Sequence, residues 1–224
     1  MLLKKQVLLP ATKKHFGLFR APFDDYAVQS ADDVFLTPDS GYAREALYQT
    51  ALFGGFIAKD SSRTGYSHVL VIEEAHALPI PTLKHLKRFF ELDDGHKKLL
   101  SIVLLGQPEL GDKLSERLLD VREVVQRCEV IDLPPLDAHL ADFLAFKFKR
   151  IGADLNKIIT PEAIKAIRQR LSYQRGGQSV PSQQRTTVSL LYPLAIGNLL
   201  TAAMNLAAQN AIPVIDANII HSVH

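Results

Sequence analysis

Two apolar runs, each followed by polar side chains, constrain the fold of this chain most. Val69–Ile72 is uninterrupted and leads into Glu73 and Glu74, and Leu100–Leu105 leads through a glycine into Gln107. Runs of Val, Leu and Ile of this length are typical of parallel strands that are buried on both faces. We therefore expect a parallel sheet with these carboxylates and this amide at its carboxyl edge.

Helical segments alternate with the strand candidates. A helix is expected from Pro38 to Phe53, preceded by Thr37 as its N-cap, and another over Pro79–Leu92. Phe56–Ala58 and Glu129–Leu133 are shorter strand candidates. This alternation predicts an α/β fold with a parallel sheet.

The chain changes character along its length. Residues 1–36 form a basic N-terminal arm, residues 37–135 the α/β core, and residues 136–224 a small domain that is expected to be all-helical. Within the last domain, residues 173–189 are rich in Gly, Ser, Gln and Arg and are expected to form a mobile loop. Three residues are expected to cap helices of this domain: Asp137, Thr160 and Asp216.

Composition excludes several classes of protein. With 224 residues, 47% hydrophobic residues and a net charge of +2, the chain is an ordinary globular protein whose charge does not by itself predict nucleic-acid binding. The single cysteine excludes an internal disulfide. The first residues lack a signal peptide and no run reaches the ~20 apolar residues of a membrane span, so we expect a cytoplasmic protein without a membrane partner.

The polar residues after the two strands suggest nucleotide chemistry. In P-loop ATPases one acid at this edge reaches Mg²⁺, usually through water, and the neighbouring acid orients the attacking water. Glu73, Glu74 and Gln107 fit these places, Gln107 as a hydrogen-bond partner of the water or the γ-phosphate. Alternatively, the acids end a strand in solvent and Gln107 begins a turn. His76 either gates Glu74 or makes a local hydrogen bond.

Basic residues suggest two further roles. Lys84, Lys87 and Arg88 share a predicted helix and could contact DNA phosphates without reading sequence, although a solvated helix face is equally expected. Arg127 could reach a nucleotide on a neighbouring subunit or form a surface salt bridge.

Taken in order, several motifs resemble the AAA+ ATPases of bacterial DNA transposition, namely the phage Mu-type B protein and the Tn7-type target-selection ATPase, and the related ExeA-type secretion ATPase. The motifs that carry the resemblance are Phe16-Gly17-Leu18, Pro22-Phe23, Asp33–Pro38, Val69–His76, Leu104–Leu110 and Leu133–Leu136. The resemblance implies an incomplete P-loop-type (AAA+) core followed by a helical lid. It implies ATP and Mg²⁺ as cofactors, with Glu73 on the metal side, Glu74 as catalytic acid, Gln107 as sensor and Arg127 as a trans-acting arginine.

The resemblance also implies partners: duplex DNA, a transposase, and further copies of the chain in a ring or helical filament. The main expectation is an ATP-dependent, DNA-binding regulator of transposition. The alternatives are a non-catalytic DNA-binding or assembly module, and a secretion-type ATPase relative that acts on protein partners.

One block of the resembling fold is missing. The phosphate-binding motif Gly-x-x-x-x-Gly-Lys-Ser/Thr occurs nowhere in the chain. Only Lys59–Ser67 separates the strand candidate Phe56–Ala58 from the acidic strand, whereas a parallel crossover needs about a dozen residues or more. An internal deletion in a prophage gene, a shortened protein, or a segment left out of the sequence would each explain the gap, so ATP hydrolysis stays open.

Overall fold

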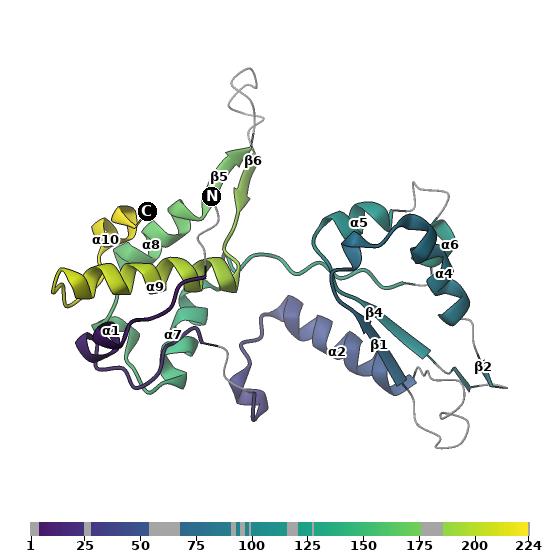
Figure 1. The fold of residues 1–224 in the computed structure, drawn as a ribbon, viewed down its shortest axis with the longest axis horizontal. Helices are drawn as coiled ribbons and strands as arrows, with labels where there is room; N and C mark the ends of the chain where they lie inside the picture. Colours follow the sequence, from purple (N-terminus) through teal and green to yellow (C-terminus); the bar gives the residue numbers. More distant parts are fainter. Residues whose placement is uncertain are drawn as a thin grey trace. The chain divides into compact units, whose positions relative to one another are not determined.

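The computed structural model describes residues 5–24, 28–53, 68–90, 93–94, 97–98, 100–115, 121–126, 128–175 and 186–223 (Figure 1). They belong to two compact units: residues 36–133, and residues 1–35 together with residues 134–224. The N-terminal segment, expected as an arm of its own, thus shares a unit with the C-terminal helices.

A short parallel sheet forms the centre of the unit 36–133 (Figure 1). β1 (His68–Ile72) pairs in parallel with β4 (Leu100–Leu104), with Ile72 opposite Leu104. These are the two apolar runs of the sequence, so the mixed α/β fold with a parallel sheet is confirmed. The expected burial on both faces is not observed. Val71 stays 51% exposed, because the described part of this sheet has two strands.

Helices and one smaller sheet complete this unit. Its helices are α2 (Pro38–Phe53), α4 (Ile80–Phe90), α5 (Glu109–Lys113) and α6 (Arg122–Val125). β2 (Asp93–Asp94) pairs antiparallel with β3 (Lys97–Lys98). The start of α2 is closed reciprocally: the N–H of Thr37 donates to Ser40 Oγ at 2.8 Å and the N–H of Ser40 donates to Thr37 Oγ1 at 3.2 Å, a variant of the capping box.

A small apolar core holds α4, α5 and α6 against the end of the sheet. Its buried members are Ala75, Leu83, Leu110, Leu114 and Val124. Ala75 lies in the 3₁₀ turn Ala75–Ala77 that follows β1, so the polar segment after the strand is fixed by packing directly beneath it.

Two strand predictions in this unit have different outcomes. Glu129–Leu133 is irregular, and Val130 and Leu133 stay 52% and 58% exposed. In the described part of the chain this apolar run has no neighbouring strand to pair with, so it forms no ladder of hydrogen bonds. The prediction of a strand over Glu129–Leu133 is therefore wrong. The strand candidate Phe56–Ala58 lies outside the described residues.

The second unit is built around α9 (Pro193–Gln209). The other α-helices described in this unit are α1 (Pro10–His15), α7 (Leu140–Arg150), α8 (Pro161–Arg170) and α10 (Ala217–Ser222). The predicted caps of α8 and α10 are confirmed: Thr160 Oγ1 accepts from the N–H of Ala163 at 3.2 Å and Asp216 Oδ1 from the N–H of Ile219 at 2.9 Å. Of the helices that the structure describes, none has the length and apolar character needed to span a membrane.

A β-hairpin interrupts the helices of this unit, which corrects the all-helical prediction. β5 (Ser172–Arg175) pairs antiparallel with β6 (Thr186–Ser189), where a loop over residues 173–189 was expected. Tyr173 lies opposite Val188, and such aromatic and β-branched residues favour strands. The Gly- and Ser-rich composition misled the prediction at both ends of the segment, and residues 176–185 lie outside the described residues.

Asp137 does not cap a helix, contrary to the prediction. α7 begins at Leu140 with His139 in the N-cap position. The carboxylate of Asp137 instead accepts a 2.7 Å hydrogen bond from Ser189 Oγ in β6, because the hairpin brings this hydroxyl within reach.

The N-terminal segment is held along α9 by an asparagine. Asn205 accepts from the N–H of Leu9 at 3.1 Å and from Thr12 Oγ1 at 2.7 Å, and it donates to the carbonyl of Val7 at 3.0 Å. Leu8 is 4% exposed between these contacts. An extended backbone and one leucine therefore dock on a single helix.

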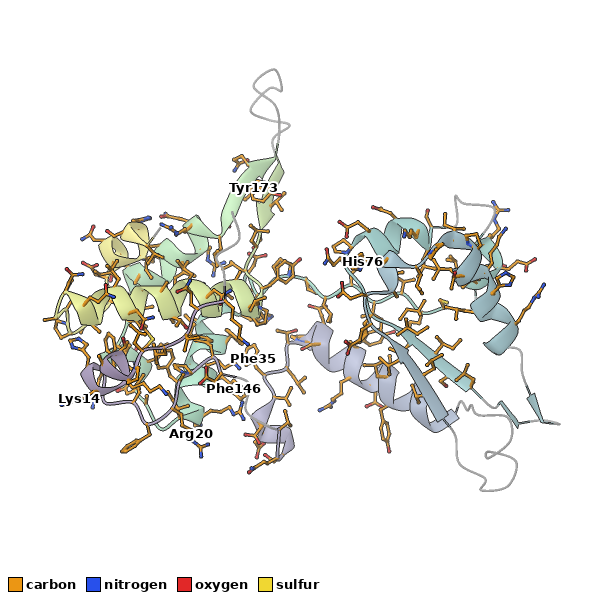
Figure 2. All side chains as sticks on the ribbon, in the orientation of Figure 1. Lys14, Arg20, Phe35, His76, Phe146 and Tyr173 are labelled. Carbon is orange, nitrogen blue, oxygen red and sulfur yellow. The ribbon has the colours of Figure 1, made fainter. Side chains whose placement is uncertain are left out.

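The end of this segment packs on α7. The ring of Phe35 lies 5.6 Å from that of Phe143 and 5.5 Å from that of Phe146 (Figure 2). Asp33 forms a 3.0 Å ion pair with Arg150 at the end of the same helix. Both contacts fix the chain just before it enters the α/β unit.

Candidate functional site

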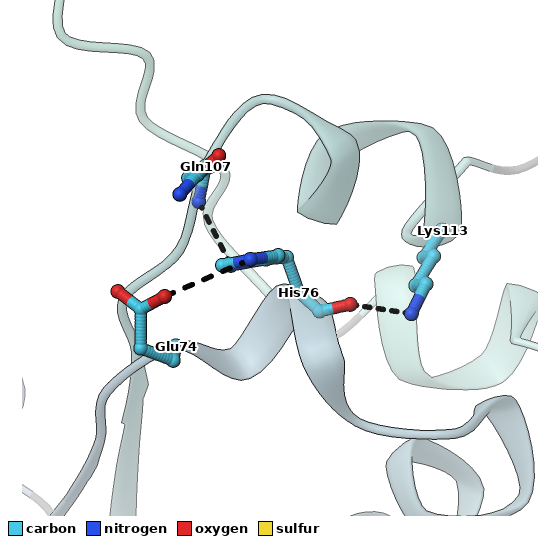
Figure 3. Close-up of polar contacts among 4 residues, drawn as sticks. All are labelled: Glu74, His76, Gln107 and Lys113. Atoms are coloured by element: carbon cyan, nitrogen blue, oxygen red, sulfur yellow. Dashed lines mark hydrogen bonds and ion pairs between the residues drawn. The ribbon is translucent and has the colours of Figure 1, made fainter.

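The carboxyl ends of β1 and β4 carry the predicted polar residues, and the backbone holds these ends together. The N–H of Leu105 donates to the carbonyl of Ile72 at 2.9 Å, and the N–H of Ala75 donates to the carbonyl of Leu105 at 2.8 Å. Parallel pairing thus continues past the last strand residues. The segments that contain Glu74 and Gln107 lie side by side as a consequence (Figure 3).

Gly106 permits this close approach. A Cβ at this position would meet Leu110 Cδ2 at 3.0 Å and the backbone nitrogen of His76 at 3.1 Å. Because a backbone atom is one of the two neighbours, the clash cannot be relieved by a rotamer change alone. Packing between the strand end and the 3₁₀ turn therefore favours glycine at this position.

His76 joins the two strand ends. The N–H of Gln107 donates to its Nδ1 at 3.3 Å, and its Nε2 lies 3.7 Å from Glu74 Oε2 (Figure 3). A nitrogen that accepts a hydrogen bond carries no proton, so in the neutral ring the proton is on Nε2, facing the carboxylate. The local hydrogen-bond role of His76 is therefore present in the structure.

The backbone at Glu74 is unusual. Glu74 has φ of 52°, in the left-handed region that non-glycine residues rarely adopt. Its side chain is 75% exposed, whereas that of His76 is 21% exposed. Glu74 is thus turned by its backbone into solvent while His76 is held against the protein.

Lys113 also contributes to this site, and the sequence did not predict its role. Its Nζ donates to the carbonyl of His76 and, at 3.0 Å, to that of Leu78 (Figure 3). A half-buried lysine in α5 therefore satisfies the carbonyls of the turn that carries His76. The only signal in the sequence is its position in the short helix after Gln107.

The other predicted residues have varied positions. Glu73 is exposed beside Glu74, and Lys84 and Arg88 are exposed on α4. Lys87 also lies in α4, but its side chain is outside what the structure describes, as is the whole of Arg127. The roles assigned to these five residues therefore stay predictions.

The residues of this edge do not fit a magnesium nucleotide by themselves. Among the described residues, no group of three His, Cys, Asp or Glu side chains could hold a metal ion. The chain lacks the glycine-rich loop whose N–H groups, lysine and hydroxyl would bind the phosphates. Carboxylates such as Glu73 and Glu74 repel a triphosphate unless a metal lies between them.

One family model and one known protein match part of the chain. Residues 39–114 match the family described as "AAA domain". The "General secretion pathway protein A" of Aeromonas hydrophila is 37% identical over 103 residues, which make up 45% of this chain and 18% of that protein. This chain therefore spans less than a fifth of its relative, and no solved structure matches it.

The family match covers α2, β1, α4, β4 and α5, which include the whole parallel sheet and the polar edge. It supports a core of the P-loop type. The transposition branch of the resemblance has no support from these matches. The central part of the chain is thus similar to AAA domains, and 103 residues of the chain are distantly similar to an ExeA-type secretion-pathway protein.

Proposed function

We propose that this chain is an AAA-type ATPase relative of the secretion type that acts on protein partners and whose own residues do not complete a nucleotide site. One observation carries the proposal: Glu74, His76 and Gln107 converge at the sheet edge, in a chain without a phosphate-binding loop. The acid and amide could position a water. Nothing in the chain supplies the amide cradle that would hold a triphosphate next to it.

Exposed apolar surface supports a role for protein partners. Val71 and Leu105, at the end of the sheet, are 51% and 45% exposed, and Leu70 is 40% exposed. Successive strand residues alternate between faces, so Leu70 and Val71 expose apolar side chains on both faces of β1, and exposed apolar surface is a feature of interaction sites. A second copy of the chain, in a ring or filament, is one partner that fits this function.

DNA binding in transposition is the second candidate function, favoured by one surface. Lys84, His85 and Arg88 are all exposed on α4. Cations on one helix can contact a phosphate backbone without reading sequence. In this function the partners would be duplex DNA and a transposase.

Calorimetry with ATP and Mg²⁺ tests the main proposal. We expect no binding tighter than about 1 mM, which corresponds to about −4 kcal/mol. Micromolar binding would show that the nucleotide site is complete and would overturn the proposal. Sedimentation velocity then tests the partner role, because assembly should not depend on ATP.

Intact mass spectrometry tests whether the protein lacks the phosphate-binding segment. A mass near 24.9 kDa means that the protein lacks the phosphate-loop block. A mass several kilodaltons higher would mean that the natural protein contains the block and would remove the basis of the proposal.

A further inference from the structure

One face of α9 binds the backbone of an extended segment. The N–H of Gln6 donates to Asn198 Oδ1 at 3.1 Å, and the N–H of Leu9 donates to Asn205 Oδ1 at 3.1 Å. Asn205 also donates from Nδ2 to the carbonyl of Val7 at 3.0 Å. Two side-chain amides thus bind three main-chain groups of residues 5–9, which run beside α9 in the direction of the helix (Figure 1).

The spacing of the two asparagines matches an extended chain. Asn205 follows Asn198 by seven helical residues, which is about 10.5 Å along the axis at about 1.5 Å per residue. Leu9 follows Gln6 by three residues, which is about 10 Å in an extended chain at about 3.3 Å per residue. Because the two lengths agree, an extended segment can present one N–H group to each asparagine.

A single leucine supplies the side-chain part of the contact. Leu8 is 4% exposed and belongs to the same buried apolar cluster as Leu199 and Ala203 of α9. Its neighbours Val7 and Leu9 are 69% and 43% exposed. This face of α9 therefore selects one apolar side chain and depends little on the side chains beside it.

The two asparagines need a backbone partner. Asn198 is buried and Asn205 is half-buried, in a helix whose other buried residues are mostly apolar. Buried polar groups in proteins are hydrogen-bonded, because leaving them unpaired is unfavourable. When residues 5–9 move away, this face of α9 therefore favours another backbone in their place.

We propose that this face of α9 is a peptide-binding site for an extended, leucine-containing segment of a protein partner, and that residues 5–9 occupy it when the partner is absent. Main-chain hydrogen bonds combined with a side-chain pocket are a recurrent way to bind extended peptides. The bound residues 5–9 define the ligand: two N–H groups, one carbonyl and one leucine side chain. The inference rests on the proposed function only for the class of partner, a protein.

The chain's own segment can be exchanged without unfolding the helical unit. Residues 5–9 lie outside the helices and strands, and such segments open locally at a lower free energy than the whole fold. As part of the same chain they still compete with a partner, at an effective concentration of the order of millimolar. Weakening the hold of residues 5–9 should therefore raise the affinity for a peptide added from solution.

Fluorescence anisotropy with a labelled peptide of residues 5–12 tests the inference on the full chain. The variant Leu8→Asp disengages the chain's own segment, because a buried carboxylate is unfavourable. We expect the peptide to bind this variant at least about tenfold tighter than the unaltered chain, in which residues 5–9 compete. Leu8→Ala is a milder variant in which the gain should be smaller. Thermal unfolding of both variants shows that the helical unit is intact.

A second substitution tests the role of the asparagine. In the Leu8→Ala chain, Asn205→Ala should weaken peptide binding by about tenfold, because two main-chain hydrogen bonds of the peptide are lost. Asn210→Ala is the matched control, because Asn210 follows the same helix and donates to the carbonyl of Leu206. The control should leave the peptide affinity unchanged.

Two altered peptides test what the face selects. The peptide with Leu8→Asp should not bind. The peptide with Val7→Ser/Leu9→Ser should bind within about threefold of the original, since both side chains are largely exposed in the bound segment. The second result separates backbone recognition from nonspecific apolar binding, which would be lost in this peptide.

Several outcomes would overturn the inference: no binding to either Leu8 variant, equal affinity for these variants and the unaltered chain, or equal losses in Asn205→Ala and Asn210→Ala. A dimer of the unaltered chain that Leu8→Asp dissociates, seen by sedimentation velocity, would mean that copies exchange this segment and would overturn the assignment to another protein. Micromolar ATP binding would overturn the proposed function without changing the peptide affinities, so the two proposals can fail separately.

Discussion

The N–H of Gln107 donates a 3.3 Å hydrogen bond to Nδ1 of His76, and through it the carboxyl ends of β1 and β4 share one imidazole. The other ring nitrogen faces Glu74 at 3.7 Å. His76, in the turn after β1, thus contacts both Glu74 and the backbone of Gln107, two residues that are far apart in sequence. The predictions below begin with this contact.

Replacing His76 by alanine should lower the free energy of unfolding by about 0.5–1.5 kcal/mol, the range for a lost hydrogen bond. His85→Ala is the matched control, because His85 is exposed on α4. Urea denaturation measures both. In the unaltered protein, ¹⁵N shifts of the neutral His76 ring should show the proton on Nε2, and a proton on Nδ1 would contradict the geometry.

Gly106→Ala should destabilise the protein by about 1–3 kcal/mol, as expected for an overpacked contact. The new methyl group would lie 3.0 Å from Leu110 Cδ2 and 3.1 Å from the backbone nitrogen of His76. Gly111→Ala is the control: a Cβ there meets nothing within 4 Å, and in α5 alanine should add up to about 1 kcal/mol. Thermal melts that shift in the same direction for both variants would contradict the packing argument.

Asp33 should titrate below its ordinary value of 3.8, because its carboxylate accepts hydrogen bonds from the N–H groups of Gln29 and Ser30, which lower its pKa more than Arg150 does. A lowered folded-state pKa stabilises the fold above the ordinary value, and this contribution is lost as the pH falls through the folded-state pKa. Carboxyl NMR titration should therefore give a pKa below 3.8 for Asp33.

Two variants check the order of these causes. In Arg150→Met the pKa of Asp33 should rise only part of the way, because both backbone hydrogen bonds stay. In Asp33→Asn the fall in stability below pH 3.8 should be shallower than in the unaltered chain. A full return to the ordinary pKa in Arg150→Met would mean that the ion pair dominates.

The sequence predicted the parts of the fold whose signals are local. The apolar runs predicted β1 and β4. A cap residue followed by a proline predicted the starts of α2 and α8. The position of the polar residues at one edge of the sheet could also be predicted, because the carboxyl ends of parallel strands lie at the same edge. Residues after those ends, Glu74 and Gln107, could be placed side by side without coordinates.

The sequence could not predict contacts that depend on a third element. Lys113 binds carbonyls of the turn around His76, and Asp137 binds a hydroxyl of β6 instead of capping α7. The hairpin was hidden by its Gly- and Ser-rich centre, although Tyr173 and Val188 favour strands. In each case the residue that makes the contact belongs to another element of the fold, so no local sequence pattern predicts the contact.

Asn205→Ala should release the N-terminal segment from α9. The variant loses the bonds to Val7, Leu9 and Thr12, and the Thr12 hydroxyl, 1% exposed, would be left without its acceptor. The expected cost is about 1–3 kcal/mol, the penalty of an unsatisfied buried group. Limited trypsin digestion should cut faster after Lys13, which is half-buried in the unaltered chain.

Asn210→Ala is the control, because Asn210 follows the same helix and donates only to the carbonyl of Leu206. It should leave the cleavage rate unchanged. If both variants are cut equally fast, the segment is held by Leu8 alone and the asparagine contacts contribute little. If only Asn205→Ala is cut faster, the hydrogen bonds of Asn205 hold the N-terminal segment on α9. This role explains why an asparagine occurs in the middle of an apolar helix. By bonding three groups of the segment, Asn205 fixes the path of the segment as well as its stability.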